Sequence, residues 1–487
     1  MKLKDVLAGL PGARITGKEE CEIRDIAYSS QAVRPGSLFA ALKGLRADGF
    51  DFIPEALDSG AAAVLSERAK PSEYDIPWIR VDDAREALAF CAANFFNHPS
   101  RSLQVLGITG TKGKTTVAYL LESILKAAGF SPGLLGTISY RGPGLSASAS
   151  RTTPEAPDLQ RMMRVLVDNG ASHCVMEVSS HALDLKRAVG IDFDVTVFTN
   201  LSGDHLDYHA SMDDYFQAKT RLFILGPHNT AVINTDDGWG KKLLTRLSTG
   251  GTTFGFNPQA TVGIEDYRFS TDGIRATVRS PAGRFSLESS LLGKPNLYNI
   301  LAASAAALTL KITIPSIQRG VISLRGVPGR FEKIPNSRGL NILVDYAHTD
   351  DALLNLLTTA RELSRGRVIV VFGAGGDRDR SKRPRMGAAA GTLADWTIVT
   401  SDNPRTENPE AIMEEIVAGI RQTGRDQFEV EVDRRSAIKK ALSKARKGDY
   451  ILIAGKGHED YQILNDRVIH FDDAEVVREL LKEMDRG

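Results

Sequence analysis

The sequence predicts an α/β protein of three domains: a mixed α/β N-terminal domain, a central P-loop domain around a parallel sheet, and a C-terminal doubly wound, Rossmann-like domain. Three observations predict this fold class. The chain has 487 residues, more than one hydrophobic core usually serves. A loop rich in glycine and lysine joins an apolar strand to an amphipathic helix within residues 103–124. In the last third, apolar strands alternate with amphipathic helices, which is typical of a parallel sheet.

Two breaks in the pattern predict the domain boundaries. The first 100 residues mix short strands and helices and end at the sequence Phe-Phe-Asn-His-Pro-Ser of residues 95–100. Residues 326–330 contain two glycines and a proline, which interrupt any helix and suit a hinge. We therefore expect domains over residues 1–100, 101–330 and 331–487.

The loop that follows the predicted strand at residues 103–108 has the features of a phosphate-binding loop. Gly110 and Gly113 allow the backbone to curl so that its N–H groups face an anion, and Lys114 supplies a positive charge. Thr115 or Thr116 offers a hydroxyl to Mg²⁺, and the helix that follows directs its positive N-terminus at the same phosphates. The first glycine of the strict motif is replaced by isoleucine, and a plain glycine-rich turn is the alternative. Because strand, loop and helix all agree, we expect an ATPase-type domain that binds the triphosphate with Gly110, Thr111, Lys112, Gly113, Lys114, Thr115 and Thr116.

Composition and charge argue against several classes of partner. The chain has 61 Lys and Arg against 60 Asp and Glu, a net charge of +1, which gives no reason to expect nucleic acid or an anionic membrane. No apolar run approaches membrane-spanning length, and the N-terminus lacks the apolar core of a signal peptide. The three cysteines show neither metal-ligand nor redox spacing. We expect a cytoplasmic protein that acts as a monomer.

Strands are predicted in the central domain at residues 173–178, 194–199 and 230–234, and polar residues follow them. Glu177 ends the first of these strands. Taken alone it would be a solvated acid, but a phosphate loop one crossover earlier makes it a candidate to hold the Mg²⁺ of the nucleotide.

Residues 204–209 contain two histidines and two aspartates directly behind the next strand, which is an unusual density of potential ligands. No cysteine accompanies them, so Mg²⁺ with an occasional imidazole is favoured over zinc. A single helix is predicted over residues 214–223, in which Lys219, judged from its residue type alone, is an ordinary solvated lysine. A stretch around residues 250–290 alternates and carries glycines typical of hairpins, so it is predicted to be antiparallel. Its strands are expected at residues 252–256, 267–269 and 273–279.

Five strands of a doubly wound sheet are predicted in the last third of the chain. Ligands bind at the carboxyl ends of such strands, and polar clusters lie there: Asp345 with His348, and residues 373–380, 401–405 and 455–460. The strands are expected at residues 342–345, 368–372, 397–400, 428–432 and 450–454.

Four motifs of the central region occur in an order shared with a known family. They read G-T-K-G-K-T-T from residue 110, M-E-V-S-S-H from 176, T-N-L-S-x-D-H-L-D-Y-H from 199 and Y-x-x-A-K-x-x-L-F from 215. In combination they resemble the Mur ligase family, the three-domain, ATP-dependent, amide-bond-forming enzymes of peptidoglycan synthesis. The resemblance continues through residues 293–303, 328–332 and 344–349, and so covers essentially the whole chain.

The resemblance implies the catalytic residues Lys114, Glu177, His205 and Lys219. By this resemblance Lys219 carries an N-carboxylated side chain, N6-carboxylysine. The chemistry is sensible, since a lysine cation would repel Mg²⁺ whereas a carbamate binds it. His205 and Lys219 would hold one Mg²⁺, and Glu177 with Thr115 the other. The nucleotide would also be held by Asn296, Arg330 and Asp345.

The N-terminal region resembles the nucleotide-sugar domain of the family member that adds the third peptide residue. Residues 34–44, followed by Ala-Asp-Gly at 47–49, carry this likeness, and the implied substrate is UDP-N-acetylmuramoyl-L-alanyl-D-glutamate. The family usually has Asp-Ser-Arg where this chain has Ser29-Ser30-Gln31, so one charge near the uridine end is lost. Leu185 stands where several relatives have Gln. The implied contacts are Tyr28, Ser30, Leu45, Arg46, Ala47, Arg151, Thr152, Thr153, Ser179, Leu185 and Arg187.

The sequence Asp-Asn-Pro-Arg at residues 402–405 resembles the motif that marks addition of meso-diaminopimelate in this family. The distal carboxylate of that amino acid suits the guanidinium of Arg405, whereas lysine ends in an ammonium that Arg405 would repel. Glu459 would pair with the distal ammonium. The implied contacts are Arg378, Asp402, Asn403, Pro404, Arg405, Gly455 and Glu459.

The expected reaction is phosphorylation of the free D-glutamate carboxylate by ATP, followed by attack of the diaminopimelate amine on the acyl phosphate. Three alternatives stay open: the same ligation with L-lysine, a folylpolyglutamate-synthase-like ligase, and a nucleotide-gated scaffold without chemistry. The residues at 402–405 argue against the first two alternatives, and the intact catalytic set argues against the third.

Overall fold

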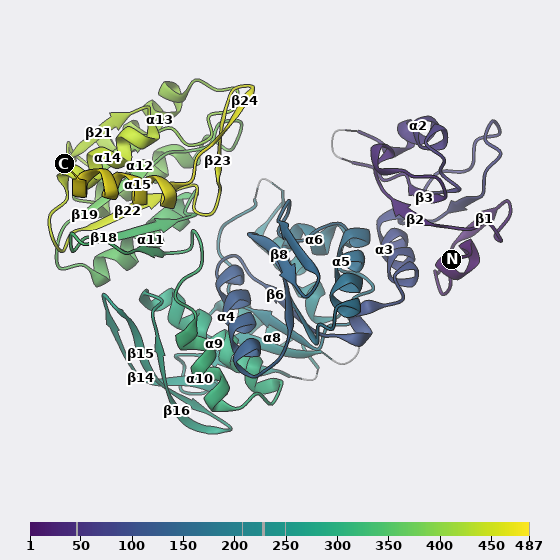
Figure 1. The fold of residues 1–487 in the computed structure, drawn as a ribbon, viewed down its shortest axis with the longest axis horizontal. Coiled ribbons are helices and arrows are strands. Elements are labelled where there is room, and N and C mark those ends of the chain that lie inside the picture. Colours follow the sequence, from purple (N-terminus) through teal and green to yellow (C-terminus); the bar gives the residue numbers. More distant parts are fainter. Residues whose placement is uncertain (45–46, 207, 226–228, 249, 487) are drawn as a thin grey trace. The chain divides into compact units, whose positions relative to one another are not determined.

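The computed structural model describes residues 1–487 apart from 45–46, 207, 226–228, 249 and 487. The chain divides into two compact units, one of Met1–Val262 with Ala302–Ile317 and the other of Gly263–Leu301 with Gln318–Gly487. Figure 1 follows the elements of both units along the sequence. The two domain boundaries expected at residues 100 and 330 stay a prediction.

The N-terminal region of the first unit is a five-stranded sheet in the order β1-β5-β4-β3-β2. β1 pairs antiparallel with β5, and the other pairs are parallel. Asp83 begins the helix that follows, because its carboxylate accepts hydrogen bonds from the backbone N–H groups of Arg85 and Glu86. The elements are α1 (Leu3–Val6), β1 (Arg14–Thr16), β2 (Asp25–Ala27), β3 (Ser37–Ala40), α2 (Ile53–Asp58), β4 (Ala63–Ser66), β5 (Trp78–Arg80) and α3 (Ala84–Phe95).

The central region is built on parallel strands in the order β13-β12-β11-β6-β10-β7, extended by the antiparallel strands β8 and β9. The innermost strands are continuous apolar runs, since helices cover both faces of such a sheet. The strands are β6 (Gln104–Thr109), β7 (Pro132–Leu135), β8 (Ser139–Gly142), β9 (Leu145–Ser148), β10 (His173–Glu177), β11 (Val195–Phe198), β12 (Thr230–Asn234) and β13 (Thr252–Gly255). The helices are α4 (Lys114–Ala127), α5 (Ala156–Asp168), α6 (Ser180–Asp184), α7 (Met212–Thr220) and α8 (Gly238–Leu244).

Two details differ from the sequence-based expectation. The prediction that residues 252–256 belong to an antiparallel stretch is wrong, because β13 pairs in parallel with β12. The helix expected over residues 214–223 is α7, which begins after its cap Ser211 and ends at Thr220, and a 3₁₀ turn at Arg221–Phe223 follows it.

The second unit opens with an antiparallel meander of β14 (Val262–Ser270), β15 (Gly273–Ser280) and β16 (Gly283–Ser289), as predicted for the rest of that stretch. The helices α9 (Gly293–Thr309) and α10 (Ile314–Ser323) come next in the chain. Most positions of α9 are small or apolar and buried, which explains why it resembles a core helix more than a surface one.

The last third forms the doubly wound sheet that the sequence predicts, in the order β17-β18-β22-β19-β20-β21, with only β17 antiparallel. α11, α12 and α13 contribute to the apolar cluster on one face, and α14 and α15 to the cluster on the other. The strands are β17 (Glu332–Ile334), β18 (Asn341–Asp345), β19 (Val368–Phe372), β20 (Trp396–Thr400), β21 (Phe428–Glu431), β22 (Tyr450–Ala454) and a separate hairpin of β23 (Tyr461–Leu464) and β24 (Arg467–His470). The helices are α11 (Asp350–Leu363), α12 (Lys382–Leu393), α13 (Pro409–Gln422), α14 (Arg434–Lys444) and α15 (Asp473–Arg486).

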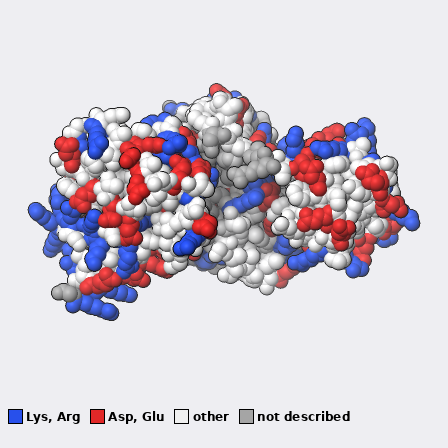
Figure 2. Space-filling view, turned by 90° about the horizontal axis from the view of Figure 1, so that it is seen from above, with Lys and Arg blue, Asp and Glu red and all other residues white. Residues whose placement is uncertain are grey.

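The surface carries both signs of charge. Figure 2 shows Lys and Arg side chains interspersed with Asp and Glu side chains over the face in view, in keeping with a net charge of +1. Among the described residues, no helix is both long enough and apolar enough to span a bilayer.

Candidate functional site

The loop between β6 and α4 has the geometry of a phosphate cradle. Gly110 has a φ of 146°, and a Cβ there would lie 1.9 Å from the Thr199 hydroxyl, so only glycine fits. Gly113 has a φ of 88° and directly precedes the first turn of α4. The Lys114 Nζ donates to the carbonyl oxygens of Gly110, at 3.0 Å, and Thr111, at 3.1 Å. The loop backbone therefore curls around the N-terminus of α4, and Lys114 adds a positive charge there. Both features favour the binding of an anion.

Glu177 lies at the end of β10, beside the strand that leads into this loop, since Glu177 is in register with Ile108. Its side chain is 1% exposed and accepts hydrogen bonds from the Thr115 hydroxyl at 2.9 Å and from the Thr137 N–H at 2.8 Å. The Thr137 hydroxyl donates to the same carboxylate at 2.9 Å. A buried carboxylate and hydroxyls at the mouth of a phosphate loop are the oxygen ligands that Mg²⁺ prefers, so the donor set fits the ion expected there.

Lys219 reaches the phosphate loop from α7 and is 1% exposed. Its Nζ donates to the Gly110 carbonyl oxygen at 2.9 Å and lies 4.6 Å from the centroid of the Tyr215 ring. Burial, together with the nearby Lys114 cation, lowers the pKa of Lys219 well below its ordinary value. Both lysines thus donate to the Gly110 carbonyl oxygen, and burial favours the neutral form of the Lys219 amine.

Aromatic and imidazole rings gather around the same helix. The His205 and Tyr215 ring centroids are 6.0 Å apart, and those of His209 and Tyr215 are 5.0 Å apart. Loss of solvation is the main reason that the pKa of His205 falls to about 4, which keeps its ring neutral and able to bind a metal. His209 is buried and its Nε2 lies 3.0 Å from the Ser180 hydroxyl, so it has a structural partner.

The structure brings the expected catalytic residues together in two groups. Glu177 and Thr115 share a hydrogen bond, and Lys219 and His205 both contact the Tyr215 ring. In the described part of the chain, no three His, Cys, Asp or Glu side chains are gathered as a ready-made metal site.

The residues expected at the sugar-peptide substrate form a connected network near Glu177. The Thr153 hydroxyl donates to the Glu177 carbonyl oxygen at 2.8 Å and accepts from the Ser179 N–H at 3.1 Å. Arg187 donates to the Thr153 carbonyl oxygen at 3.0 Å and pairs with Glu155 at 2.8 Å. Arg151 also pairs with Glu155, and the Thr152 hydroxyl contacts that of Thr137. Leu185 lies at the end of α6.

A hollow of about 560 Å³ lies beside residues that are expected to contact the uridine end of the UDP-substrate. Ser30 is buried in the turn beside it, and Ala47 is exposed. The Tyr28 hydroxyl donates to Asp158 at 2.7 Å. Leu45 and Arg46 lie outside the described residues. The hollow is lined in part by Asp25, Tyr28, Ser29, Gln31, Arg34, Asp158 and Arg161, so the two positions that depart from the family pattern lie in its wall.

In the second unit, two of the three expected nucleotide contacts are neighbours. The Asp345 carboxylate accepts a hydrogen bond at 2.7 Å from the backbone N–H of Phe331, the residue that follows Arg330. The Arg330 guanidinium lies 4.8 Å from the centroid of the Tyr346 ring. Asn296 has local partners in the first turns of α9, donating to the Leu292 carbonyl oxygen.

Three loops at the carboxyl ends of β19, β20 and β22 form the expected amino-acid site. The Asn403 amide donates to Glu459 at 3.0 Å. The fully buried Lys456 Nζ lies 3.3 Å from the Asn403 Oδ1, 3.5 Å from Glu459 and 3.6 Å from Asp402. A Cβ at Gly455 would lie 2.9 Å from the Asp402 carboxylate, so this glycine allows the loops to meet. Burial raises the pKa of Glu459, and Lys456 opposes that rise.

Both expected arginines flank one glycine of the loop after β19. A Cβ built on Gly375 would lie 3.0 Å from the Arg405 Nη1 and 3.8 Å from the Arg378 Cγ. Arg405 has a φ of 52° and donates to the Gly376 carbonyl oxygen at 2.6 Å, and Pro404 is buried beside it. The site therefore combines guanidinium groups with the carboxylate of Glu459, which is the charge pattern that a zwitterion requires.

Sequence reasoning missed several residues of these sites. Thr137, Glu155 and Lys456 lie next to expected residues in space but belong to no motif that was singled out for them. Lys456 lies within the polar cluster at residues 455–460, but the sequence predicted no role for it. Its burial among acidic side chains depends on the packing of β22 against the neighbouring loops.

Comparison with known proteins gives matches along the whole chain. Family models match residues 22–96 ("Mur ligase family, catalytic domain"), 108–307 ("Mur ligase middle domain") and 329–457 ("Mur ligase, glutamate ligase domain"). A UDP-N-acetylmuramoyl-L-alanyl-D-glutamate–2,6-diaminopimelate ligase of Geobacter metallireducens is 46% identical, covering 99% of both chains. The protein of the same name from Gloeobacter violaceus is 47% identical, over 100% of this chain and 99% of its own. A solved structure of a ligase of that name has a TM-score of 0.73 and 32% identity, covering 100% of both chains.

Proposed function

The chain belongs to the Mur ligase family, whose members are ATP-dependent, amide-bond-forming ligases, and we propose that it adds meso-diaminopimelate to UDP-N-acetylmuramoyl-L-alanyl-D-glutamate. Relatives at 46% and 47% identity carry the name of this activity. The observation that carries the proposal is the site around Gly375, where Arg378 and Arg405 flank one glycine and Glu459 is bound to the adjacent Asn403.

The reaction proceeds in two steps. An oxygen of the D-glutamate side-chain carboxylate attacks the γ-phosphorus of ATP, the bond to the ADP oxygen breaks, and an acyl phosphate forms. The neutral amine of diaminopimelate then attacks the acyl carbon, and the intermediate collapses to amide and inorganic phosphate with loss of one proton. The phosphate loop and Lys114 hold and neutralise the phosphates, so this chain contributes positioning and charge stabilisation.

We propose that Mg²⁺ acts in this site. When bound, it neutralises phosphate charge and polarises the transferred group. Thr115 and Glu177 would hold one ion, and His205 with Lys219 the other. The oxygen-rich donors of the first pair and the neutral imidazole of the second support this assignment.

Lys219 is proposed to carry the carboxyl group of N6-carboxylysine. Its neutral amine is the form that attacks CO₂: a bond forms between Nζ and carbon, one proton leaves, and the product is an anion. The depressed pKa of Lys219, caused mainly by burial, supports this step, because the neutral amine is the nucleophile.

Charge complementarity at the amino-acid site supports diaminopimelate over lysine. The distal carboxylate would bind Arg405 with Arg378 nearby, and the distal ammonium would bind Glu459. Lysine offers the ammonium alone and leaves the guanidinium groups without an anionic partner, which disfavours it.

Replacement of Arg405 should change this preference. Because a charge-assisted guanidinium–carboxylate contact is worth about 3 kcal/mol, Arg405→Ala should lower kcat/KM for diaminopimelate by ~100-fold. Lysine should lose much less, since it has no distal carboxylate. The measurement is the ratio of the two specificity constants in wild type and variant. Arg435→Ala is the matched control, because Arg435 on α14 forms an ion pair with Glu479 on α15. If the ratio is the same in Arg405→Ala as in wild type, Arg405 does not select the amino acid.

The pH dependence should report the charge of Glu459. Its raised pKa means that, as pH falls, the carboxyl becomes neutral earlier than an exposed glutamate would, and kcat/KM for diaminopimelate declines with it. Lys456→Met removes the cation that lowers this pKa, so the acid limb of the profile should move to higher pH. The exposed Lys439→Met is the control. An acid limb that stays in place in Lys456→Met would contradict the role given to Glu459.

A phosphate-release assay tests the proposed function directly. The protein should release phosphate from ATP only when UDP-N-acetylmuramoyl-L-alanyl-D-glutamate and diaminopimelate are both present. Release that ignores either substrate would contradict the proposal. No release with all three present would also contradict it and would favour a scaffold without chemistry.

The working state of the protein is also proposed. We infer a cytoplasmic monomer without a nucleic-acid partner. The net charge of +1 and the mixed surface charge support the last part of this inference, since a nucleic-acid partner favours a basic surface. Light scattering at assay concentration should give the mass of one 52.8 kDa chain.

A further inference from the structure

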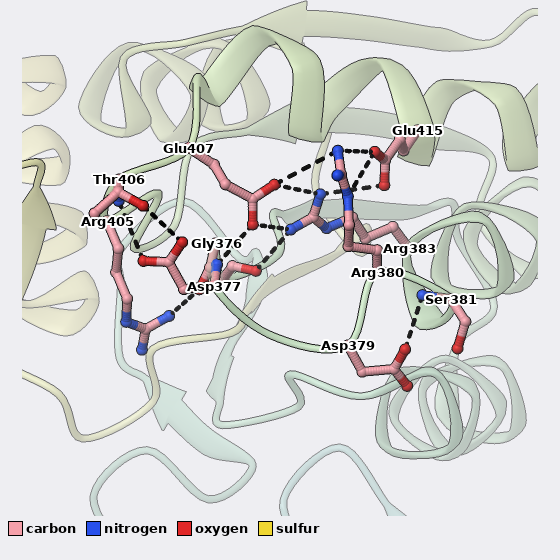
Figure 3. A network of polar contacts seen from close by, with 11 residues as sticks. Gly376, Asp377, Asp379, Arg380, Ser381, Arg383, Arg405, Thr406, Glu407 and Glu415 are labelled. Atoms are coloured by element: carbon pink, nitrogen blue, oxygen red, sulfur yellow. Dashed lines mark hydrogen bonds and ion pairs between the residues drawn. The ribbon is translucent and has the colours of Figure 1, made fainter. Parts of the chain in front are cut away.

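Arg383, in the first turn of α12, is a fully buried guanidinium at the base of the amino-acid site (Figure 3). Its Nη1 donates to Glu407 at 3.0 Å and to Glu415 at 3.1 Å. Its Nη2 donates to Glu407 at 2.8 Å and to the Gly375 carbonyl oxygen at 3.3 Å. A buried charge is costly unless it is paired, so these contacts are required to keep Arg383 in place.

Glu407 joins two loops through one carboxylate. It lies in the loop after β20, yet its Oε1 accepts from the Asp377 N–H, in the loop after β19, at 2.6 Å. In the other direction, the Asp377 carboxylate accepts hydrogen bonds from the Thr406 hydroxyl at 2.7 Å and from the Thr406 N–H at 3.3 Å. The contact with Arg383 is the main reason that the pKa of Glu407 falls to about 2, so it stays charged at all working pH values.

These two loops carry the two arginines of the amino-acid site. Asp377 and Arg405 have φ values of 54° and 52°, a conformation that costs energy in residues other than glycine. The loops touch so closely that a Cβ on Gly376 would lie 1.9 Å from the Pro404 carbonyl oxygen. Arg383 on α12 contacts these loops from outside, through Glu407 and the Gly375 carbonyl oxygen, and so helps to hold this backbone.

We infer that the Arg383–Glu407 pair is a positioning device that fixes Arg378 and Arg405 at the spacing that selects the amino-acid substrate. This inference rests on the proposed function, since it needs diaminopimelate as the ligand of those arginines. Neither Arg383 nor Glu407 touches the substrate in this account. Their effect passes through the loop backbone at Gly375, Asp377 and Thr406.

The test compares Glu407→Gln, which keeps the side-chain shape and removes the charge, with Arg383→Met, which keeps an apolar stem in the buried site. Each variant should raise KM for diaminopimelate about 10-fold or more, because small misplacements of binding groups are costly, while kcat at saturation and the KM values for ATP and the UDP-substrate stay near wild type. Arg385→Met is the matched control, since Arg385 lies on the same helix in an exposed pair with Asp350.

A double-mutant cycle separates positioning from general stability. If the pair acts through Arg405, adding Glu407→Gln to Arg405→Ala should cost much less in kcat/KM for diaminopimelate than Glu407→Gln alone. Full additivity, or equal losses for all three substrates, would overturn the inference. If Arg383→Met fails to fold, as a thermal melt would reveal, Glu407→Gln still decides the outcome. Failure of wild type itself to ligate diaminopimelate would instead overturn the proposed function.

Discussion

Lys219→Ala is expected to reduce ligation about 1000-fold or more while the protein stays folded. The reason is the loss of the side chain proposed to become an anionic metal ligand, which stabilises charge on the transferred phosphoryl group. The structure supports this role because Lys219 is buried, contacts the Gly110 carbonyl oxygen of the phosphate loop, and has a pKa well below the ordinary value. A lysine kept only for packing would not need to reach that oxygen.

The measurement is the steady-state rate of amide formation, with a thermal melt to establish folding. High bicarbonate should not restore activity, since the amine that takes up CO₂ is gone, whereas a short carboxylic acid should restore part of it by standing in for the missing carbamate. Lys242→Ala is the control, because Lys242 forms a surface ion pair with Asp213 on α7. Turnover near the wild-type rate in Lys219→Ala would contradict the assignment.

Lys114→Ala is expected to reduce ATP-dependent turnover about 1000-fold and to leave binding of the UDP-substrate largely intact. The lysine begins α4 and donates to two carbonyl oxygens of the phosphate loop, so its loss removes both a charge and a brace for that loop. The uridine end of the UDP-substrate is assigned to the hollow that Tyr28 lines, away from the loop residues.

Calorimetric titration of Lys114→Ala with the UDP-substrate should show that binding of this substrate is largely intact. A second titration, with a non-hydrolysable ATP analogue, should show that binding of the nucleotide is lost. Lys126→Ala is the matched control on the same helix, because Glu122 keeps Arg141 as a partner when Lys126 is removed. Equal loss of both bindings in Lys114→Ala would show that the assignment of the two ligands to different regions is wrong.

Local patterns predicted most of the parallel sheets. The strands at Val368–Phe372, Thr230–Asn234 and Tyr450–Ala454 have the bounds expected from their apolar runs, because both faces are buried and the signal is continuous. The error at β13 has a physical cause: a short alternating strand looks the same whether its partner runs parallel or antiparallel. The pairing direction depends on β12, which the alternation within β13 does not reveal.

Some residues of the candidate site could be predicted from the local sequence and others could not. Lys114 and Glu177 could be assigned from the residues around them, since a strand, a loop and a helix define a phosphate site locally. Lys219 looked ordinary until the resemblance to a family was used, because its burial against Gly110 joins residues far apart in the sequence. The same holds for Lys456 and Glu407. Their roles depend on contacts between loops that only the folded sheet brings together.

The most direct test of the central claim is a competition between amino acids in one reaction. The protein is incubated with ATP, UDP-N-acetylmuramoyl-L-alanyl-D-glutamate and equal concentrations of meso-diaminopimelate and L-lysine, and the products are separated by mass. The account predicts that the diaminopimelate adduct predominates and that phosphate is released in equal amount to the amide formed. Predominance of the lysine adduct, or phosphate release without any amide product, would contradict it.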